Sequence, residues 1–186
     1  MSFPTACSVC IGRCCTRYSI EVTAHDLQRI SSAQGLPAAT ICGTVPSWEG
    51  RCPIEPSRIR GDLVNVVISQ SDTGCRFYRG GHDGNCGIYP VRPRSCAVYP
   101  FFGGDGIVLQ RENLPCPAPW SAQRHAPTVA DDIDIMMAEI STHNQLVRDI
   151  NTRVDDTAEL TTYVNLLIDA LAAHNHAHHG GTTPTS

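Results

Sequence analysis

Four cysteines within the first fifteen residues constrain this chain more than any other feature. Cys7, Cys10, Cys14 and Cys15 lie inside a stretch of nine residues, a density that apolar packing does not explain. A Cys-x-x-Cys step lets two thiolates turn toward one ion, and the side chains of adjacent cysteines leave the backbone in different directions. The block therefore predicts half of a metal site. The adjacent pair Cys14 and Cys15 is expected to serve two centres, or two metals of one centre.

The predicted second half begins about sixty residues later, because thiolates from distant parts of a chain can complete one metal site. It consists of four more clustered cysteines, Cys75, Cys86, Cys96 and Cys116. Thiolates from distant segments can close a tetrahedral zinc site or hold an iron–sulfur cluster. Eight thiolates would fill two four-thiolate sites, or one [4Fe–4S] cluster with four thiols to spare, and both arrangements stay open.

The start of the chain bears on the state of these thiols. Residues 1–6 contain neither a basic region nor an apolar stretch before Cys7, which predicts a cytoplasmic protein. Clustered cysteines in a reducing compartment are more often metal ligands or redox thiols than disulfides. No apolar run approaches the roughly 18 residues of a membrane span, so no membrane partner is expected.

Charge narrows the class of partner. The net charge is −4 and no basic stripe is present, which argues against nucleic acid. We expect another protein as the partner, and the sequence identifies no small-molecule substrate.

The basic residues are all arginine. Six of them lie within four residues of a clustered cysteine: Arg13, Arg17, Arg76, Arg79, Arg92 and Arg94. Four thiolates around a divalent ion leave a charge of about −2, which nearby guanidinium groups can offset. Arg92 and Arg94 are expected to donate to sulfur, and Tyr89, Tyr99 and Phe101 to form an apolar shell that limits water near the metal.

Short strands are predicted from alternating or β-branched runs at 18–22, 63–68, 74–78 and 107–109. The runs 63–68 and 74–78 are expected to form a hairpin that carries Cys75. Residues 38–61 contain many helix and strand breakers and predict a loop.

Helices are predicted on both sides of the cysteine-rich region. Thr23 followed by Asp26 is a capping signal for a helix that ends at Gly35. Beyond Trp120, apolar residues at helical spacing predict two further helices, over about 129–150 and 160–171, that pair in antiparallel fashion.

The predicted fold is a small, irregular, metal-stabilised α+β domain with short antiparallel strands and a C-terminal antiparallel helix pair. The 186 residues suit a single domain, 1–186. Its cysteine-cluster part spans 7–120, its helical part spans 121–175, and a disordered tail spans 176–186.

Two cysteines and several histidines stand outside the predicted metal set. Cys42 and Cys52 have no second ligand nearby in sequence, and a free cysteine is often a small buried hydrophobe. His82 is interpreted as a solvated turn residue. The histidine-rich stretch 174–181 could bind metal adventitiously, but it is interpreted as a disordered end.

The two cysteine blocks, together with their surroundings, resemble a known family. Its features here are the first block, Cys75-Arg76-Phe77-Tyr78, Cys86-Gly87-Ile88-Tyr89, Arg92-Pro93-Arg94-Ser95-Cys96, Tyr99-Pro100-Phe101 and Cys116. Residues 7 to 120 are similar to the YkgJ-type cysteine cluster family, also called the CxxCxxCC or zinc- or iron-chelating domain. All eight cysteines shared by that family have counterparts, so the resemblance implies eight metal ligands: Cys7, Cys10, Cys14, Cys15, Cys75, Cys86, Cys96 and Cys116.

The resemblance implies zinc or iron as the occupant, with an iron–sulfur cluster as one form, and an accessory or metal-handling role. An alternative follows from relatives labelled Fe–S cluster oxidoreductases and from the related flagellin lysine-N-methylases: an iron–sulfur-dependent oxidoreductase or a protein-modifying enzyme. The sequence does not decide whether the chain is an enzyme. It departs from the family in three ways: three residues separate Cys10 from Cys14, Ala97 follows Cys96 where a basic residue is common, and Cys42 and Cys52 are extra.

Overall fold

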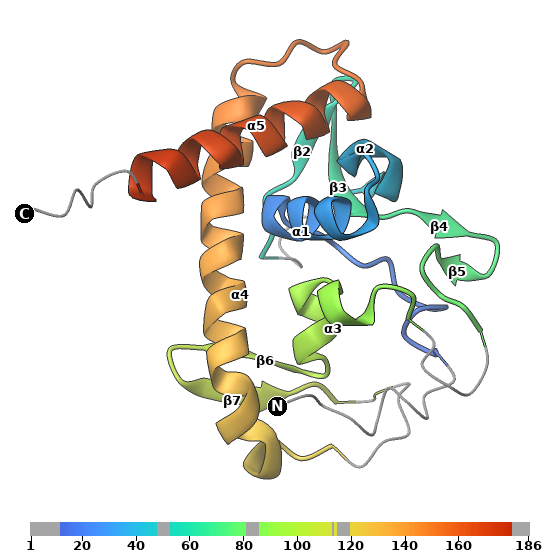
Figure 1. Ribbon diagram of the computed structural model, residues 1–186, viewed down its shortest axis with the longest axis vertical. Helices are drawn as coiled ribbons and strands as arrows, with labels where there is room; N and C mark the ends of the chain where they lie inside the picture. Colours follow the sequence, from blue (N-terminus) through green and yellow to red (C-terminus); the bar gives the residue numbers. More distant parts are fainter. Residues whose placement is uncertain (1–11, 48–52, 81–85, 113, 115–119, 180–186) are drawn as a thin grey trace, which may run out of the picture.

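A thirty-residue helix, α4 (Ala122–Asn151), runs along the long axis of the molecule (Figure 1). The computed structural model describes residues 12–47, 53–80, 86–112, 114 and 120–179. The remaining helices are α1 (Ala24–Gln34), α2 (Ala38–Ile41), the 3-10 helix η1 (Tyr89–Val91), α3 (Arg94–Val98) and α5 (Leu160–His179). The strands are β1 (Cys42–Pro46), β2 (Ser57–Ile59), β3 (Asp62–Ile68), β4 (Gln70–Ser71), β5 (Gly74–Cys75), β6 (Phe101–Gly104) and β7 (Ile107–Gln110). The predicted α+β class is confirmed.

Local sequence explains the start and end of α1. The Thr23 hydroxyl accepts a hydrogen bond from the Asp26 N–H, and the Asp26 carboxylate accepts one from the Thr23 N–H, which completes a capping box. Gly35 ends the helix with φ of 63°, a left-handed conformation that glycine adopts without steric cost. Both ends of α1 therefore lie where the sequence predicts them.

The three-stranded sheet corrects the prediction of a loop over 38–61. Its order is β1-β3-β2, all antiparallel, so two of its three strands and α2 come from the segment predicted to be irregular. β1 is an edge strand, and Pro46 at its end pairs with Val64 of the central strand. The Gly and Pro residues of this segment separate short strands, and these strands pair with β3.

A second correction concerns the expected hairpin between 63–68 and 74–78. β5 pairs with β4, in register Gln70 with Cys75, and not with β3. Cys75 therefore lies on a two-residue strand that projects from the sheet (Figure 1). The strand predicted at 18–22 is reduced to one bridge, between Glu21 and Val67. The strand predicted at 107–109 is present as β7.

Two apolar clusters hold these elements together, and α4 contributes to both. The main core is formed by buried residues of α1, α2, the sheet, α5 and the C-terminal half of α4, among them Leu27, Ile68 and Leu167. The smaller cluster joins the N-terminal half of α4 to α3 and β6 through Val98, Phe101, Val129 and Ile133. The cysteine-rich segments lie between these two clusters.

The two C-terminal helices pack against each other, as predicted, but Figure 1 shows α5 crossing α4 rather than running alongside it as an antiparallel partner. α5 continues to His179, so its helix includes residues 176–179, which were assigned to the tail. Residues 180–186 lie outside the described part of the chain. None of the described helices is long and apolar enough to cross a membrane.

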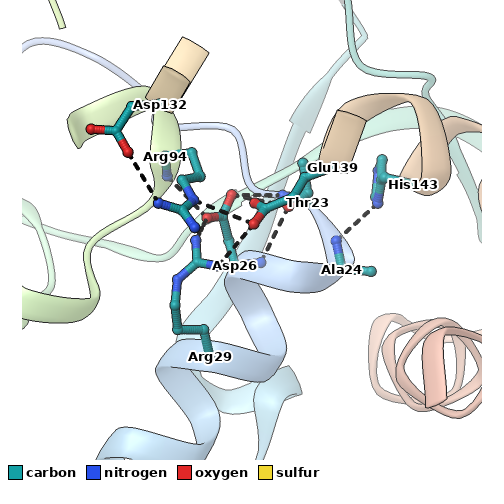
Figure 2. Close-up of polar contacts among 8 residues, drawn as sticks. All are labelled: Thr23, Ala24, Asp26, Arg29, Arg94, Asp132, Glu139 and His143. Carbon is teal, nitrogen blue, oxygen red and sulfur yellow. Dashed lines mark hydrogen bonds and ion pairs between the residues drawn. The ribbon is translucent and has the colours of Figure 1, made fainter. Parts of the chain in front are cut away.

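A buried histidine links α4 to the start of α1 and makes stability sensitive to acid. The Nδ1 atom of His143 accepts a hydrogen bond from the Ala24 N–H at 3.0 Å, and the side chain is almost fully buried (Figure 2). Burial, with a smaller contribution from the charge of His25, lowers the pKa of His143 to about 3. The folded protein therefore holds this imidazole neutral, as an acceptor.

We expect stability to fall as pH drops below about 6.5, the ordinary pKa of histidine, because the unfolded chain then binds a proton that folded His143 refuses. The contribution is fully present above that pH and declines towards pH 3, with about 2 kcal/mol lost by pH 5. Urea unfolding at pH 7.5 and pH 5 measures it. His143→Asn keeps an acceptor that does not titrate, so its pH dependence should be flatter by that amount. An unchanged slope would contradict the assignment.

Candidate metal centre

Five of the predicted ligands border one cavity of about 620 Å³. They come from four separate segments of the chain and are Cys14, Cys15, Cys75, Cys86 and Cys96. Ligands from separate segments are common in folded metal sites, where thiolates from distant parts of the chain surround one centre. The structure thus brings together members of both cysteine blocks.

Two close backbone approaches fix the first block against β5. The Cys75 N–H donates to the Cys15 carbonyl at 2.8 Å, and Gly74 allows this contact because a Cβ there would lie 2.4 Å from the same oxygen. Gly12 has φ of 68°, and a Cβ on it would lie 2.1 Å from the Tyr78 ring. Glycine is required at both positions for the turn that carries Cys14 and Cys15 to reach β5.

The other two cysteines are held by short-range hydrogen bonds. Cys86 forms a β-bridge with Tyr78, and the next N–H, of Gly87, donates to the Phe77 carbonyl at 2.8 Å. Cys96 lies in α3, where its N–H donates to the Pro93 carbonyl at 2.9 Å. Both thiols are therefore presented from ordered backbone.

The thiols are close enough to resist simultaneous ionisation. A hydrogen bond from the Cys15 thiol lowers the pKa of Cys14 and raises that of Cys15. Burial raises the pKa of Cys96 well above its usual range, and negative charge on Cys14, Cys86 and Cys75 raises it further. A cation among these sulfurs would remove the penalty, because thiolate is the form that binds a metal.

Positive charge from arginine reaches one side of the cavity. Arg92 and Arg79 lower the pKa of Cys86 and partly offset the effect of its burial. The Arg92 guanidinium lies 3.8 Å from the centre of the Tyr89 ring and donates through Nη1 to the Tyr89 carbonyl. Its Nε is buried and has no hydrogen-bond partner within the described residues. An unused buried donor beside a thiol fits a site that carries negative charge.

Arg94 has a different role from the one predicted. Its side chain pairs with Glu139 at 3.3 Å and with Asp132 at 3.6 Å, both on α4, so among the described residues its guanidinium meets carboxylates and not sulfur (Figure 2). Its N–H donates to the Asp26 carboxylate at 3.0 Å, and Asp26 also pairs with Arg29. This network ties the first residue of α3, and so the helix that carries Cys96, to α1 and α4.

Sequence reasoning missed this network. Asp26 was identified only as a helix cap, and Glu139 was not singled out. Asp26 has two carboxylate oxygens, and the second accepts the Arg94 N–H across 68 residues of chain, which no local pattern reveals. A usable signal was that Asp26 lies on the face of α1 that carries Leu27 and Ile30.

Aromatic and aliphatic side chains form most of the rest of the cavity wall, which also includes Arg17, Glu21 and Arg111. Tyr89, Tyr99 and Phe101 line it, as expected, together with Trp120 and Met136. The Phe101 and Trp120 rings meet edge to face, with centroids 5.7 Å apart. The half-buried thiols therefore face a largely apolar space.

Cys42 lies apart from this centre. It is buried in the main core, its thiol donates to the Ala38 carbonyl at 3.4 Å, and it does not line the cavity. Burial raises its pKa to about 11, which favours the neutral thiol. Four other residues that the sequence singled out, Cys7, Cys10, Cys116 and Cys52, lie outside the described part of the chain, as does His82.

The donor set fits a metal, although its ligands do not converge on a single point. Within the part of the chain that the structure describes, no three His, Cys, Asp or Glu side chains form a group that could hold an ion. The five thiols instead surround a shared space. Soft sulfur donors suit zinc or iron, and the neighbouring arginine offsets the negative charge of the thiolates.

Thiols gathered from distant segments around one space define a class of metal-chelating cysteine proteins. Residues 6–117 match the family model CxxCxxCC, described as a "Putative zinc- or iron-chelating domain", and the chain belongs to that family. A comparison with curated proteins found no match, and neither did a comparison with solved structures.

Proposed function

We propose that this protein is an accessory metal-handling protein that holds zinc or iron through thiolates and acts on, or delivers to, another protein in the cytoplasm. Its ligands would be the five cysteines of the cavity together with Cys7, Cys10 and Cys116. When bound, the metal supplies charge neutralisation and a cross-link between segments that otherwise touch through few contacts.

One observation carries this proposal: thiols from four segments surround one cavity, and neighbouring thiolates raise the pKa values of Cys15 and Cys96. A fold that needed these cysteines only as small hydrophobes would bury them separately, as it buries Cys42. Instead it gathers groups whose ionised forms repel, and a cation is the partner that makes such a grouping stable.

The test compares two single substitutions in protein purified without oxygen. Cys96→Ser should lower the metal content per chain, because a hard hydroxyl replaces a soft thiolate. Cys42→Ser is the matched control, since it removes a buried thiol outside the cavity and should leave metal content unchanged. Elemental analysis measures both. Equal loss of metal in the two variants would overturn the proposed ligand set.

A second function is favoured by the cavity itself. A space of about 620 Å³ with aromatic walls beside the thiols is large enough for a small substrate, which suits an iron–sulfur-dependent oxidoreductase or protein-modifying enzyme. In that case Tyr99, Phe101 and Trp120 would hold the substrate and exclude water, and the thiolates would hold the cluster.

Acid-labile sulfide separates the two functions. Iron with stoichiometric sulfide and absorbance at about 400 nm would favour the enzyme, because these are properties of thiolate-held iron–sulfur clusters. Colourless protein that contains zinc would exclude it, because zinc has no redox chemistry.

A further inference from the structure

Four of the eight histidines are neighbours in a series that runs from α4 through α1 to the end of α5: His143, His25, His174 and His178. His143 accepts a hydrogen bond from the Ala24 N–H at the start of α1. His25 lies on α1, close enough to His174 on α5 for their charges to interact. The fourth is His178. In Figure 1 the end of α5 extends past α4, on the opposite side from α3 and β5.

Helical periodicity places His174 and His178 on one face. The buried stripe of α5 contains Tyr163, Val164, Leu167 and Leu171, all fully inaccessible to solvent. Continuing that stripe by three and then four residues reaches His174 and His178. As the helix leaves the core, the same face changes from aliphatic to imidazole.

The two rings already lie together. Their centroids are 4.4 Å apart with an angle of 50° between the ring planes. His174 is partly exposed and His178 is exposed, so an ion can reach both from solvent. The site is also near the carbonyl end of α5, where the partial negative charge of the helix terminus favours a cation.

We propose that His174 and His178 form a second metal site, a two-imidazole chelate for a borderline divalent transition metal such as Ni²⁺, Cu²⁺ or Zn²⁺. Imidazole nitrogen suits these ions, whereas the cysteine centre offers softer sulfur. Water completes the coordination, because the pair supplies two ligands. This site does not depend on the proposed function of the cysteines.

The test is equilibrium dialysis of the protein as purified against Ni²⁺ at neutral pH, with the double variant His174→Ala, His178→Ala as the comparison. The wild type should bind one Ni²⁺ per chain more than the double variant. Each single variant should bind that ion at least about tenfold more weakly, since one of two ligands is lost. Paramagnetic broadening should appear first in the ring signals of these two histidines. Unchanged melting temperatures would verify that the variants are folded.

His176→Ala is the matched control, because residue 176 lies on the opposite face of the helix and is exposed. It should retain the ion at wild-type affinity. Equal weakening by His176→Ala would mean that the ion associates diffusely with a histidine-rich end, and would overturn the proposal, as would a double variant that binds like the wild type. The metal held by cysteine in the same samples should be unaffected, so failure here leaves the proposed function standing.

Discussion

Chelating the metal from the purified protein is expected to unfold the cysteine-bearing segments and to leave the main core folded. The turn with Cys14 and Cys15, the β4–β5 hairpin, the bridge at Cys86 and α3 are joined mainly by single hydrogen bonds. Metal binding at a structural thiolate site is worth on the order of 10 kcal/mol and becomes folding free energy for whatever it cross-links. The sheet, α1 and α5 share an apolar core of their own and do not need it.

Hydrogen exchange before and after chelation measures this division. Amides of 74–80 and 86–98 should lose protection, whereas those of 63–68 and 160–171 should keep it. The helices and the sheet thus act as an internal control in the same sample. Unchanged protection throughout would show that the metal is dispensable for the fold, and uniform loss would show that the two parts unfold as one.

Asp26→Ala is expected to cost about 3–5 kcal/mol, the range for removing one partner from a buried ionic network. Asp26 is 2% exposed and accepts hydrogen bonds from Thr23 and from the Arg94 N–H. Burial raises the pKa of Asp26 and these donors oppose the shift, so its loss leaves buried donors without an acceptor. Arg94 is the first residue of α3, the helix that carries Cys96, so the variant should also bind metal more weakly.

Asp132→Ala provides the control for Asp26→Ala. Asp132 pairs with the same arginine at 3.6 Å but is 40% exposed, and exposed ion pairs contribute at most about 1 kcal/mol. Urea unfolding gives both free energies, and elemental analysis gives metal retention. If the two variants proved equally mild, the network would not be what positions α3.

The parts of the fold that follow from neighbouring residues could be predicted. The Thr23–Asp26 capping box, the end of α1 at Gly35 and the apolar stripe of α4 each depend on residues within a few positions of one another. The prediction of a loop over 38–61 was wrong because β1 and β2 form strands only by pairing with β3. Their Gly and Pro residues also obscure the alternation of apolar and polar residues that indicates a strand.

The structure brings five of the eight predicted ligands to one cavity, but the surroundings of these cysteines could not be predicted. Spacing and resemblance indicated which cysteines belong together, and Cys42 was correctly expected to lie apart. Nothing local distinguishes Arg92, which stays beside the thiols, from Arg94, which turns to α4, because their sequence surroundings are nearly the same. That difference arises from Glu139 and Asp132, which lie more than thirty residues away.

The position of α4 between two apolar clusters has a consequence for the lifetime of the metal-free chain. If α3 and its neighbours loosen, Val129, Ile133 and Met136 lose the side chains that cover them, while the other half of the helix stays fixed in the core. A rigid helix then presents an apolar stripe to solvent, the kind of surface that promotes aggregation and attracts chaperones and proteases. Metal supply would in this way set how much of the protein persists, and shortage would remove empty chains.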